Sequence, residues 1–311
     1  MPVFNEGQAL SRYVPEVLQA LRQFGVPVEI ILVNDGSKDQ SGAVMAQLSA
    51  AHPEVLSLDL SRNFGKEAAL CAGLDAAQGD AVLVMDSDGQ HPLDVVPRMW
   101  AQLEAGAEVA YAVRRQRLDQ SHLQRRLTRW FYALVNWGNS TEIPEDAGDF
   151  RMMRRSVVEA LRALPERNRF MKGLYAWVGF RSVALDYDPL PRLHGQSSFG
   201  LQGSLRLGLT GLFAFSLAPL RVVALLGAAL AMVSLAYGLF VIAEYWLWGI
   251  TVPGYATIVV ALMFFNGVQL IAMGLLAEYL ARVYEEVKRR PLYWVRERHG
   301  QGLGVPPSAA S

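Results

Sequence analysis

This sequence has only one cysteine, no net charge and no long apolar run directly after Met1. Its 311 residues include a single cysteine, Cys71, and 29 basic residues balance 29 acidic ones. One thiol excludes an internal disulfide, and no Cys/His group has the spacing of zinc ligands, so we expect Cys71 to be a small buried core residue. The zero net charge gives no reason to expect nucleic acid as a partner. The polar residues that follow Met1 do not form a signal peptide, so we expect the N-terminal part to lie in the cytoplasm.

Residues 1–195 alternate short apolar runs with stretches typical of helices. The expected strands are Val28–Val33, Val55–Leu60, Ala81–Met85 and Glu108–Val113, and the expected helices are Gln8–Phe24, Ser41–Ala51, Lys66–Ala77 and Leu93–Ala105. This alternation predicts an α/β fold with a mostly parallel, Rossmann-like sheet. In such sheets ligands bind beyond the carboxyl ends of the strands, where the unusual polar residues of this sequence fall.

Beyond residue 215 the sequence becomes strongly apolar. Val222–Ala243 and Tyr255–Ala277 contain no charged residue. A helix needs about 20 apolar residues to cross a bilayer. Two buried core helices of a soluble domain are the alternative, but neither segment has a polar face to meet water. The sequence therefore predicts two transmembrane helices.

The flanking charges predict how this pair is oriented. Arginines precede the first span, further basic residues follow the second, and the loop between the spans has no Lys or Arg. Both ends are therefore expected on the cytoplasmic side, as a hairpin. The expected organisation is a catalytic domain (1–195), an amphipathic interface helix region (196–218), two transmembrane helices (219–280, with spans at about 222–243 and 255–277) and a cytoplasmic tail (281–311) that ends in a disordered segment.

Two carboxylates, Asp86 and Asp88, close the apolar run that ends at Met85. Aspartate oxygens are hard ligands that suit Mg²⁺ or Mn²⁺. A metal ion held there would stabilise a diphosphate leaving group. A solvated turn is the alternative for an isolated Asp-x-Asp, but the position after a buried strand favours the metal site.

Two further acidic residues are candidates for the same site. Asp35, in Asn34–Ser37, also follows a strand and can accept hydrogen bonds from a base or ribose, although these are also turn residues. Asp149 lies in Gly148-Asp149-Phe150-Arg151 beside a predicted short strand and is a candidate base or acceptor-positioning residue. A surface salt bridge between Asp149 and Arg151 is the alternative there.

A set of arginines is a further candidate for ligand binding. Arg114, Arg115 and Arg117 follow a strand, three more lie on a helical stretch, and Arg192 lies in a Pro-rich segment. Guanidinium groups bind phosphate with two hydrogen bonds, and basic residues beside membrane helices meet anionic lipid. A solvated cationic face is the alternative for part of this set.

Taken together in their order, these motifs resemble the family 2 glycosyltransferases of GT-A fold, and within them the polyprenyl-phosphate glycosyltransferases. The matching segments are Pro2–Glu6, Asn34–Ser37, Ser61–Lys66, Asp86–Pro92, Gly148–Arg151 and Arg192–Phe199, followed by the two membrane helices. Each motif is weak alone, but the ordered set is specific. It spans about residues 2–295.

The resemblance implies a membrane-bound hexosyltransferase. It would move a sugar, with UDP-glucose the preferred donor, onto undecaprenyl or another polyprenyl phosphate at the cytoplasmic face of the inner membrane, with inversion. It implies Mg²⁺ or Mn²⁺ as cofactor, a role in cell-envelope polysaccharide, and a homo-oligomer, plausibly a tetramer. By role, the implied residues are Asp149 and Asp88 (catalytic); Pro2, Phe4, Glu6, Asp35, Lys66, Asp86 and Gln90 (nucleotide-sugar); Asp86, Asp88 and His91 (metal); and Arg114, Arg117, Arg192 and Ser197 (lipid phosphate).

Some features depart from the family pattern and leave alternatives open. The chain begins almost inside the first motif, so we expect either a shortened start or an incomplete base pocket. Asn34 stands where many relatives have Asp, and Ser198-Phe199 replaces a common Lys-Tyr. The rivals are a catalytically silent nucleotide-sugar binder, a processive polysaccharide synthase, whose Gln-x-x-Arg-Trp motif is missing here, and a flippase subunit, which would need more polar groups in its spans.

Overall fold

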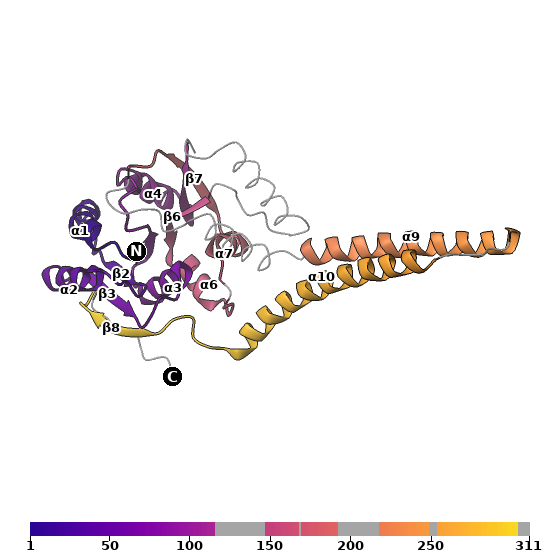
Figure 1. Ribbon diagram of the computed structural model, residues 1–311. Coiled ribbons are helices and arrows are strands. Elements are labelled where there is room, and N and C mark those ends of the chain that lie inside the picture. Colours follow the sequence, from indigo (N-terminus) through magenta and orange to yellow (C-terminus); the bar gives the residue numbers. More distant parts are fainter. Residues whose placement is uncertain (116–146, 168, 192–217, 249–253, 304–311) are drawn as a thin grey trace.

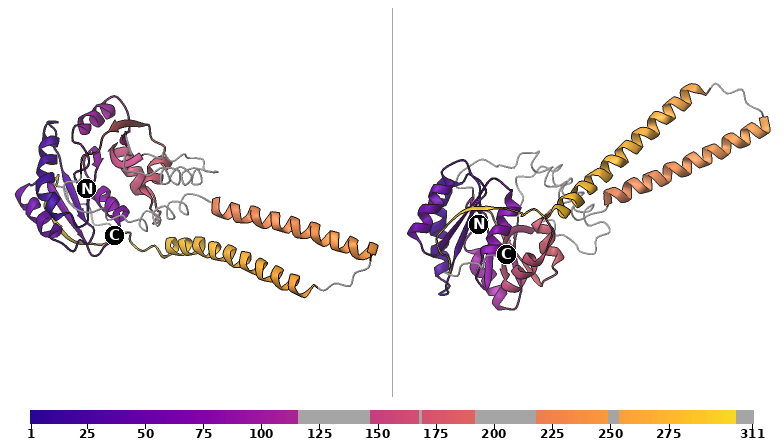
Figure 2. Two further views of the ribbon diagram at one scale, coloured as in Figure 1. Left: turned by 45° about the horizontal axis from the view of Figure 1, so that its top comes forward. Right: turned by 90° about the horizontal axis from the view of Figure 1, so that it is seen from below.

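The computed structural model describes residues 1–115, 147–167, 169–191, 218–248 and 254–303. Its body is an α/β domain, and a hairpin of two long helices projects from it (Figure 1). Two further views show the same projection (Figure 2).

The first half of the domain is a parallel sheet with helices packed on it. Val3 lies opposite Asn34, and Asn34 lies opposite Asp59, so the carboxyl ends of three strands share one edge. Every residue of the central strand is buried, as expected for a parallel strand covered on both faces. The elements are β1 (Pro2–Val3), α1 (Gly7–Arg22), β2 (Ile30–Asn34), α2 (Ser41–Ala51), β3 (Val55–Leu60) and α3 (Lys66–Ala76).

The second half forms a second sheet with strand order β4-β6-β5-β7. β7 runs parallel to β5, whereas β6 is antiparallel to both of its neighbours. The hydroxyl of Ser87, just after β4, donates a hydrogen bond of 3.0 Å to the carbonyl of Pro2 and links the two sheets at the predicted ligand edge. The elements are β4 (Ala81–Val84), α4 (Val95–Glu104), β5 (Val109–Arg114), β6 (Ala147–Arg154), α6 (Arg155–Ala163), α7 (Met171–Trp177) and β7 (Ser182–Tyr187).

The two long helices are α9 (Ala218–Trp248) and α10 (Tyr255–Lys288), and they contain both predicted spans. Within them, Val222–Val241 and Ala261–Lys288 are long and apolar enough to cross a membrane, and neither segment is buried in the protein. Large apolar side chains such as Met232 and Leu270 are about two-thirds exposed. A helix that shows apolar residues on all sides requires an apolar surrounding. The predicted interface helix region lies outside the described residues, apart from Ala218.

The chain returns to the domain after α10, which the sequence did not predict. β8 (Val295–His299) pairs antiparallel with β3 at the edge of the first sheet. Just before it, the Tyr293 hydroxyl donates a 2.6 Å hydrogen bond to Asp75 Oδ2. Part of the expected tail is therefore an ordered strand of the catalytic domain.

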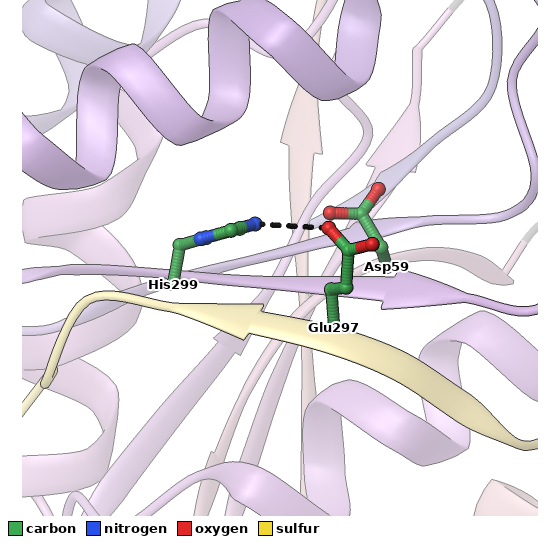
Figure 3. Close-up of side chains that lie close together, drawn as sticks. All are labelled: Asp59, Glu297 and His299. Carbon is green, nitrogen blue, oxygen red and sulfur yellow. Dashed lines mark ion pairs between the residues drawn. The ribbon is translucent and has the colours of Figure 1, made fainter.

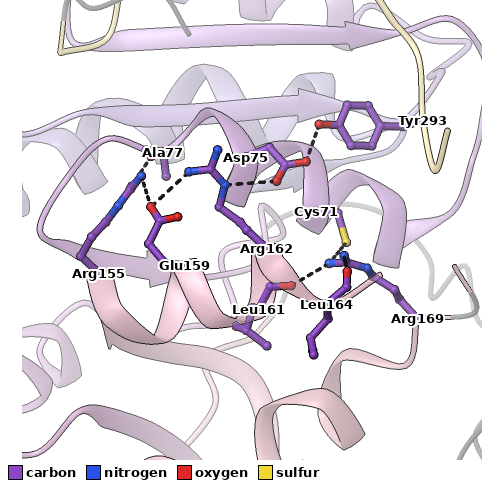
Figure 4. Close-up of polar contacts among 10 residues, drawn as sticks. All are labelled: Cys71, Asp75, Ala77, Arg155, Glu159, Leu161, Arg162, Leu164, Arg169 and Tyr293. Carbon is purple, nitrogen blue, oxygen red and sulfur yellow. Dashed lines mark hydrogen bonds and ion pairs between the residues drawn. The ribbon is translucent and has the colours of Figure 1, made fainter. Parts of the chain in front are cut away.

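A polar network joins α3 to α6 beneath this return (Figure 4). Arg162 lies 3.5 Å from Asp75 Oδ1 and 3.2 Å from Glu159 Oε1. The guanidinium of Arg169 contacts Cys71 Sγ at 3.4 Å. Burial raises the pKa of the Cys71 thiol to about 11, so this cysteine is the buried core residue that the sequence predicted.

Candidate active site

Reciprocal hydrogen bonds join the loops that follow β1 and β2. The Asn5 N–H donates to Ser37 Oγ at 2.9 Å, and the Lys38 N–H donates to Asn5 Oδ1 at 2.8 Å. Asn5 adopts a φ of 56°, in the left-handed region that asparagine tolerates. Phe4, between these bonds and the strand, is 38% exposed. The two segments predicted to hold the donor nucleotide therefore form one surface.

Asp35 fastens a third loop to this surface. Its buried carboxylate accepts hydrogen bonds from the N–H groups of Phe64, at 2.7 Å, and Gly65, at 3.0 Å. Burial raises the pKa of Asp35, and these bonds partly oppose the rise. The described contacts of Asp35 are thus with the protein's own backbone, and its predicted contact with base or ribose stays a prediction.

Lys66 joins two of the predicted acidic residues. Its Nζ lies 2.7 Å from Asp86 Oδ1 and 2.8 Å from Asp149 Oδ2. These residues come from the start of α3, the turn after β4 and strand β6, so the fold brings together segments far apart in the sequence. The ammonium group stands between the two carboxylates, where it offsets part of their negative charge.

The ion pairs dominate the protonation of this centre. Burial by itself would raise the pKa of Asp86, but Lys66 and His91 outweigh it and hold this pKa well below its usual range. Burial likewise lowers the pKa of Lys66, but the two carboxylates raise it above its ordinary value. Lys66 is therefore charged and Asp86 ionised at neutral pH.

Asp88 and His91 lie on the turn after β4. Asp88 Oδ1 accepts a 3.0 Å hydrogen bond from the Gln90 N–H, which shapes the turn. His91 is buried, its Nε2 lies 3.5 Å from Asp86 Oδ2, and its ring packs 4.3 Å from that of Phe150. The predicted ligands Asp86, Asp88 and His91 thus share one turn.

One buried polar atom on this turn and another on β6 are candidates to face a cation. His91 Nδ1 and Asp149 Oδ1 are buried and have no hydrogen-bond partner within the described ranges. Buried polar groups almost always have partners, and a bound ion is one explanation for such an exception. The carboxylate oxygens of Asp86 and Asp88 fit Mg²⁺ or Mn²⁺, and the imidazole of His91 favours Mn²⁺, although Lys66 holds one oxygen of Asp86. A more compact set of ligand atoms lies elsewhere, on Asp59, Glu297 and His299 (Figure 3).

Sequence reasoning missed Glu67, the neighbour of Lys66. Its Oε2 accepts a 3.1 Å hydrogen bond from the Met171 N–H. Burial, and next the charge of Asp149, raise the pKa of Glu67 to about 7. The only sequence signal for Glu67 is its position directly after Lys66, the last residue of the Ser61–Lys66 motif. The family pattern assigns no role to it.

The acceptor side is described in part. Arg114 Nε donates a 3.2 Å hydrogen bond to the Tyr187 hydroxyl, at the ends of β5 and β7. Arg151 is buried, its guanidinium donates to the Gly148 carbonyl at 2.6 Å, and it stacks 3.5 Å from the centre of the Tyr175 ring. The alternative of a surface salt bridge between Arg151 and Asp149 is therefore wrong. The predicted residues Arg117, Arg192 and Ser197 lie outside the described residues.

Comparison with known proteins shows the family to which the chain belongs. The family described as glycosyl transferase family 2 matches residues 1–162, and the GtrB C-terminal hairpin matches residues 218–283. An uncharacterized glycosyltransferase of Synechocystis is 42% identical, over 96% of this chain and 94% of that protein. The bactoprenol glucosyl transferase of Shigella phage SfII is 41% identical, over 96% and 97%. Mannosyl-3-phosphoglycerate synthase from Rubrobacter xylanophilus, a crystal structure, aligns with a TM-score of 0.45 and 16% identity over 73% of each chain.

A GT-A type α/β domain with acidic strand ends, followed by an apolar helical hairpin, defines a glycosyltransferase with a membrane-type appendage. The chain belongs to the family 2 glycosyltransferases and carries the GtrB C-terminal hairpin.

Proposed function

We propose that this enzyme transfers a hexosyl group, preferably glucosyl from UDP-glucose, to a polyprenyl phosphate, with inversion at the anomeric carbon. The observation that carries the proposal is the centre at which Lys66 joins Asp86 to Asp149, in a chain whose hairpin exposes apolar residues on all sides. The likeness to bactoprenol glucosyl transferases over nearly the whole chain supports a lipid phosphate as acceptor.

The interlocked loops after β1 and β2 would hold the nucleotide. Phe4 offers a partly exposed ring to a base, and Glu6, two residues further along the chain, donates its N–H to Ser41 Oγ at 3.0 Å. Pro2 and Gln90 lie on the same edge, because the Pro2 carbonyl bonds Ser87 and the Gln90 N–H bonds Asp88. Asp86, Asp88 and His91 would hold Mg²⁺ or Mn²⁺, which supplies charge stabilisation for the departing nucleoside diphosphate.

The acceptor needs little help from a base. A phosphate monoester has a second pKa of about 6, so its oxygen is largely ionised at neutral pH. That oxygen attacks the anomeric carbon from the face opposite the leaving diphosphate, and the new C–O bond forms as the old one breaks. Asp149, held by Lys66 at 2.8 Å, is therefore assigned to orient the acceptor and the donor sugar rather than to remove a proton.

The hairpin would anchor the enzyme in the cytoplasmic membrane as two spans, with the catalytic domain in the cytoplasm. Arg114, with Arg117, Arg192 and Ser197, would receive the lipid phosphate, because guanidinium binds phosphate with paired hydrogen bonds. We further propose a homo-oligomer, such as a tetramer, that gathers hairpins side by side in the bilayer.

A transfer assay tests this proposal. Purified full-length protein in detergent is offered undecaprenyl phosphate, Mn²⁺ or Mg²⁺, and radiolabelled UDP- or GDP-sugars in turn. We expect label in the lipid fraction from UDP-glucose, and we expect Asp88→Ala to lower it by at least about a hundredfold. Asp94→Ala is the matched control, because Asp94 is exposed on the same segment and makes no capping hydrogen bond.

The outcomes separate the alternatives. No transfer from any donor despite measurable nucleotide binding would identify a silent binder and overturn the proposal. Polymeric sugar that is not extracted with lipid would identify a processive synthase. Transfer from another donor would refute only the choice of UDP-glucose and would leave the rest of the proposal standing.

A further inference from the structure

A histidine and two carboxylates converge where β8 pairs with β3, outside the candidate active site. Asp59, Glu297 and His299 each place one ligand atom within 4.8 Å of the other two. Figure 3 shows the His299 ring directed at the Glu297 carboxylate, with Asp59 on the adjacent strand. His299 Nε2 and Glu297 Oε2 are 3.5 Å apart.

The antiparallel register explains how the three side chains meet. Asp59 lies opposite Glu297, and Ser57 lies opposite His299. Residues two apart in a strand point to the same face, and directly opposed residues share that face. These four side chains therefore form one patch on one face of the sheet, built from segments more than two hundred residues apart in the chain.

Asp59 is buried and already oriented. It is 5% exposed, and its Oδ1 accepts a 2.6 Å hydrogen bond from Asn34 Nδ2. Among the described residues no Lys or Arg forms an ion pair with it, and the nearest arginine contact of the patch is the exposed Arg296, 3.8 Å from Glu297 Oε1. A buried carboxylate held by a second hydrogen-bonding residue is the arrangement that metal ligands show.

Ser57 gives an independent indication of a ligand. It is fully buried, on the same face and directly opposite His299, yet its Oγ has no hydrogen-bond partner in the described parts of the chain. A buried hydroxyl without a partner is costly unless an ion or water supplies one. The unsatisfied hydroxyl and the carboxylate of Asp59 therefore lie on one patch.

We propose that Asp59, Glu297 and His299 bind a divalent transition-metal ion of the Zn²⁺ class. Imidazole nitrogen with carboxylate oxygens is a zinc donor set, and it disfavours Mg²⁺, which prefers oxygen ligands and water. The ion ties β8, the strand that continues from α10, to β3 of the catalytic domain. This site therefore fastens the helical hairpin to the domain, whatever sugar the enzyme transfers.

Zn²⁺ binding to the full-length protein in detergent tests this proposal after removal of metals with a chelator. Asp86→Asn/Asp88→Asn serves as the background, so that the candidate active site does not contribute. We expect calorimetry to show one Zn²⁺ per chain, and Zn²⁺ to raise the melting temperature. Glu297→Gln and His299→Ala should each weaken binding by at least about tenfold. Arg298→Gln, on the same strand but the opposite face, is the matched control and should leave binding unchanged.

The variants also keep the test decisive if one of them misfolds. Glu297 is largely exposed, so its replacement by Gln leaves the fold intact even if His299→Ala does not. Co²⁺ in place of Zn²⁺ adds a spectroscopic readout, because visible absorption bands should appear in the background protein and disappear in Glu297→Gln. Zn²⁺ affinity that is the same in Glu297→Gln, His299→Ala and Arg298→Gln, or no binding in the background protein, would overturn the proposal.

Discussion

At the scale of single residues, Lys66 and Glu67 show how their surroundings shift the pKa values of two adjacent ionisable groups. Both lie at the start of α3 and are partly buried. Lys66 contacts the two carboxylates Asp86 and Asp149 and stays charged, whereas Glu67 lies near Asp149 and is harder to ionise. The first residue therefore balances the negative charge of the site, and the second adds to it only above neutral pH.

Replacement of Lys66 by Met should separate metal affinity from turnover. Without the ammonium group, Asp86 and Asp149 lose their described cation, and Mn²⁺ should bind about tenfold more tightly. Turnover should fall by about a hundredfold, because Asp149 loses the contact that positions it. Calorimetry with Mn²⁺ and the lipid transfer assay measure the two effects. Lys38→Met, at an exposed site in the neighbouring loop, is the control. Unchanged Mn²⁺ affinity would show that Lys66 does not compete with the ion.

Glu67 should make stability depend on pH. Its pKa rises from 4.5 to about 7 in the folded protein, so between these values the folded state binds more protons than the unfolded state. Stability should therefore fall as pH rises from about 4.5 to 7 and then level off, at a cost of at most about 3 kcal/mol. Glu67→Gln should flatten this part of the profile of melting temperature against pH. Glu104→Gln, at an exposed helix end, should keep the wild-type slope, and a Glu67→Gln profile that still falls by the full amount would refute the assignment.

At the scale of elements, the candidate site depends on loops that hold one another. The loop after β2 bonds the loop after β1 through Asn5, and Asp35 bonds the loop after β3 through Phe64 and Gly65. Gly36 permits this approach, because its φ is 67° and a Cβ there would lie 2.5 Å from the Asn63 nitrogen. Strands β1, β2 and β3 run in register, so the loops that follow them lie close enough to form these hydrogen bonds.

Gly36→Ala tests this packing against a matched glycine. Gly25 has nearly the same φ, 66°, but a Cβ there would meet nothing within 4 Å. Gly25→Ala should cost about 1 kcal/mol for the left-handed backbone alone. Gly36→Ala should cost about 2 kcal/mol more, because the loop at Asn63 must move, and should raise the KM for the nucleotide sugar. Melting curves and donor titrations measure both, and equal effects of the two variants would rule out the steric argument.

The periodicity of the sequence predicted most elements, but not β8. Strand β2 is a mostly apolar run and β3 has apolar residues at four of its six positions, and the observed helices α2 and α3 match the expected ranges within a residue. In contrast, β8 reads Val-Arg-Glu-Arg-His, with one apolar residue, because it is an edge strand that pairs on one side only. Its position depends on backbone pairing with β3, to which side-chain hydropathy gives no clue.

At the scale of the whole molecule, the helical hairpin is attached to the catalytic domain at its C-terminal end by several contacts. Glu286, near the end of α10, accepts a 2.8 Å hydrogen bond from the Arg167 N–H, and Tyr293 bonds Asp75. The Trp294 carbonyl accepts a 2.9 Å hydrogen bond from Ser61 N–H, next to the loop that Asp35 holds. The chain that follows the helical hairpin is thus hydrogen-bonded to an edge of the candidate donor site.

Two shortened proteins with different C-terminal ends test this attachment. A protein that ends at Lys288 keeps the hairpin but loses Tyr293 and β8, whereas one that ends at Leu303 keeps both. The shorter protein should melt at least about 5 °C lower, because it exposes the edge of β3 and loses at least about 2 kcal/mol. Thermal unfolding in detergent, followed by tryptophan fluorescence, measures the difference. Equal melting temperatures would show that the returning strand contributes nothing to stability.

The sequence by itself determined the α/β class, the order of most strands and helices, the two apolar spans and the acidic residues at strand ends. These properties follow from hydropathy and local residue preference, which act over a few neighbouring positions. The tertiary structure decided that Lys66 lies between Asp86 and Asp149, that Glu67 is partly buried near Asp149, and that His299 and Glu297 meet Asp59. Those relations depend on distant segments that pair and pack only once the chain has folded, so no local pattern encodes them.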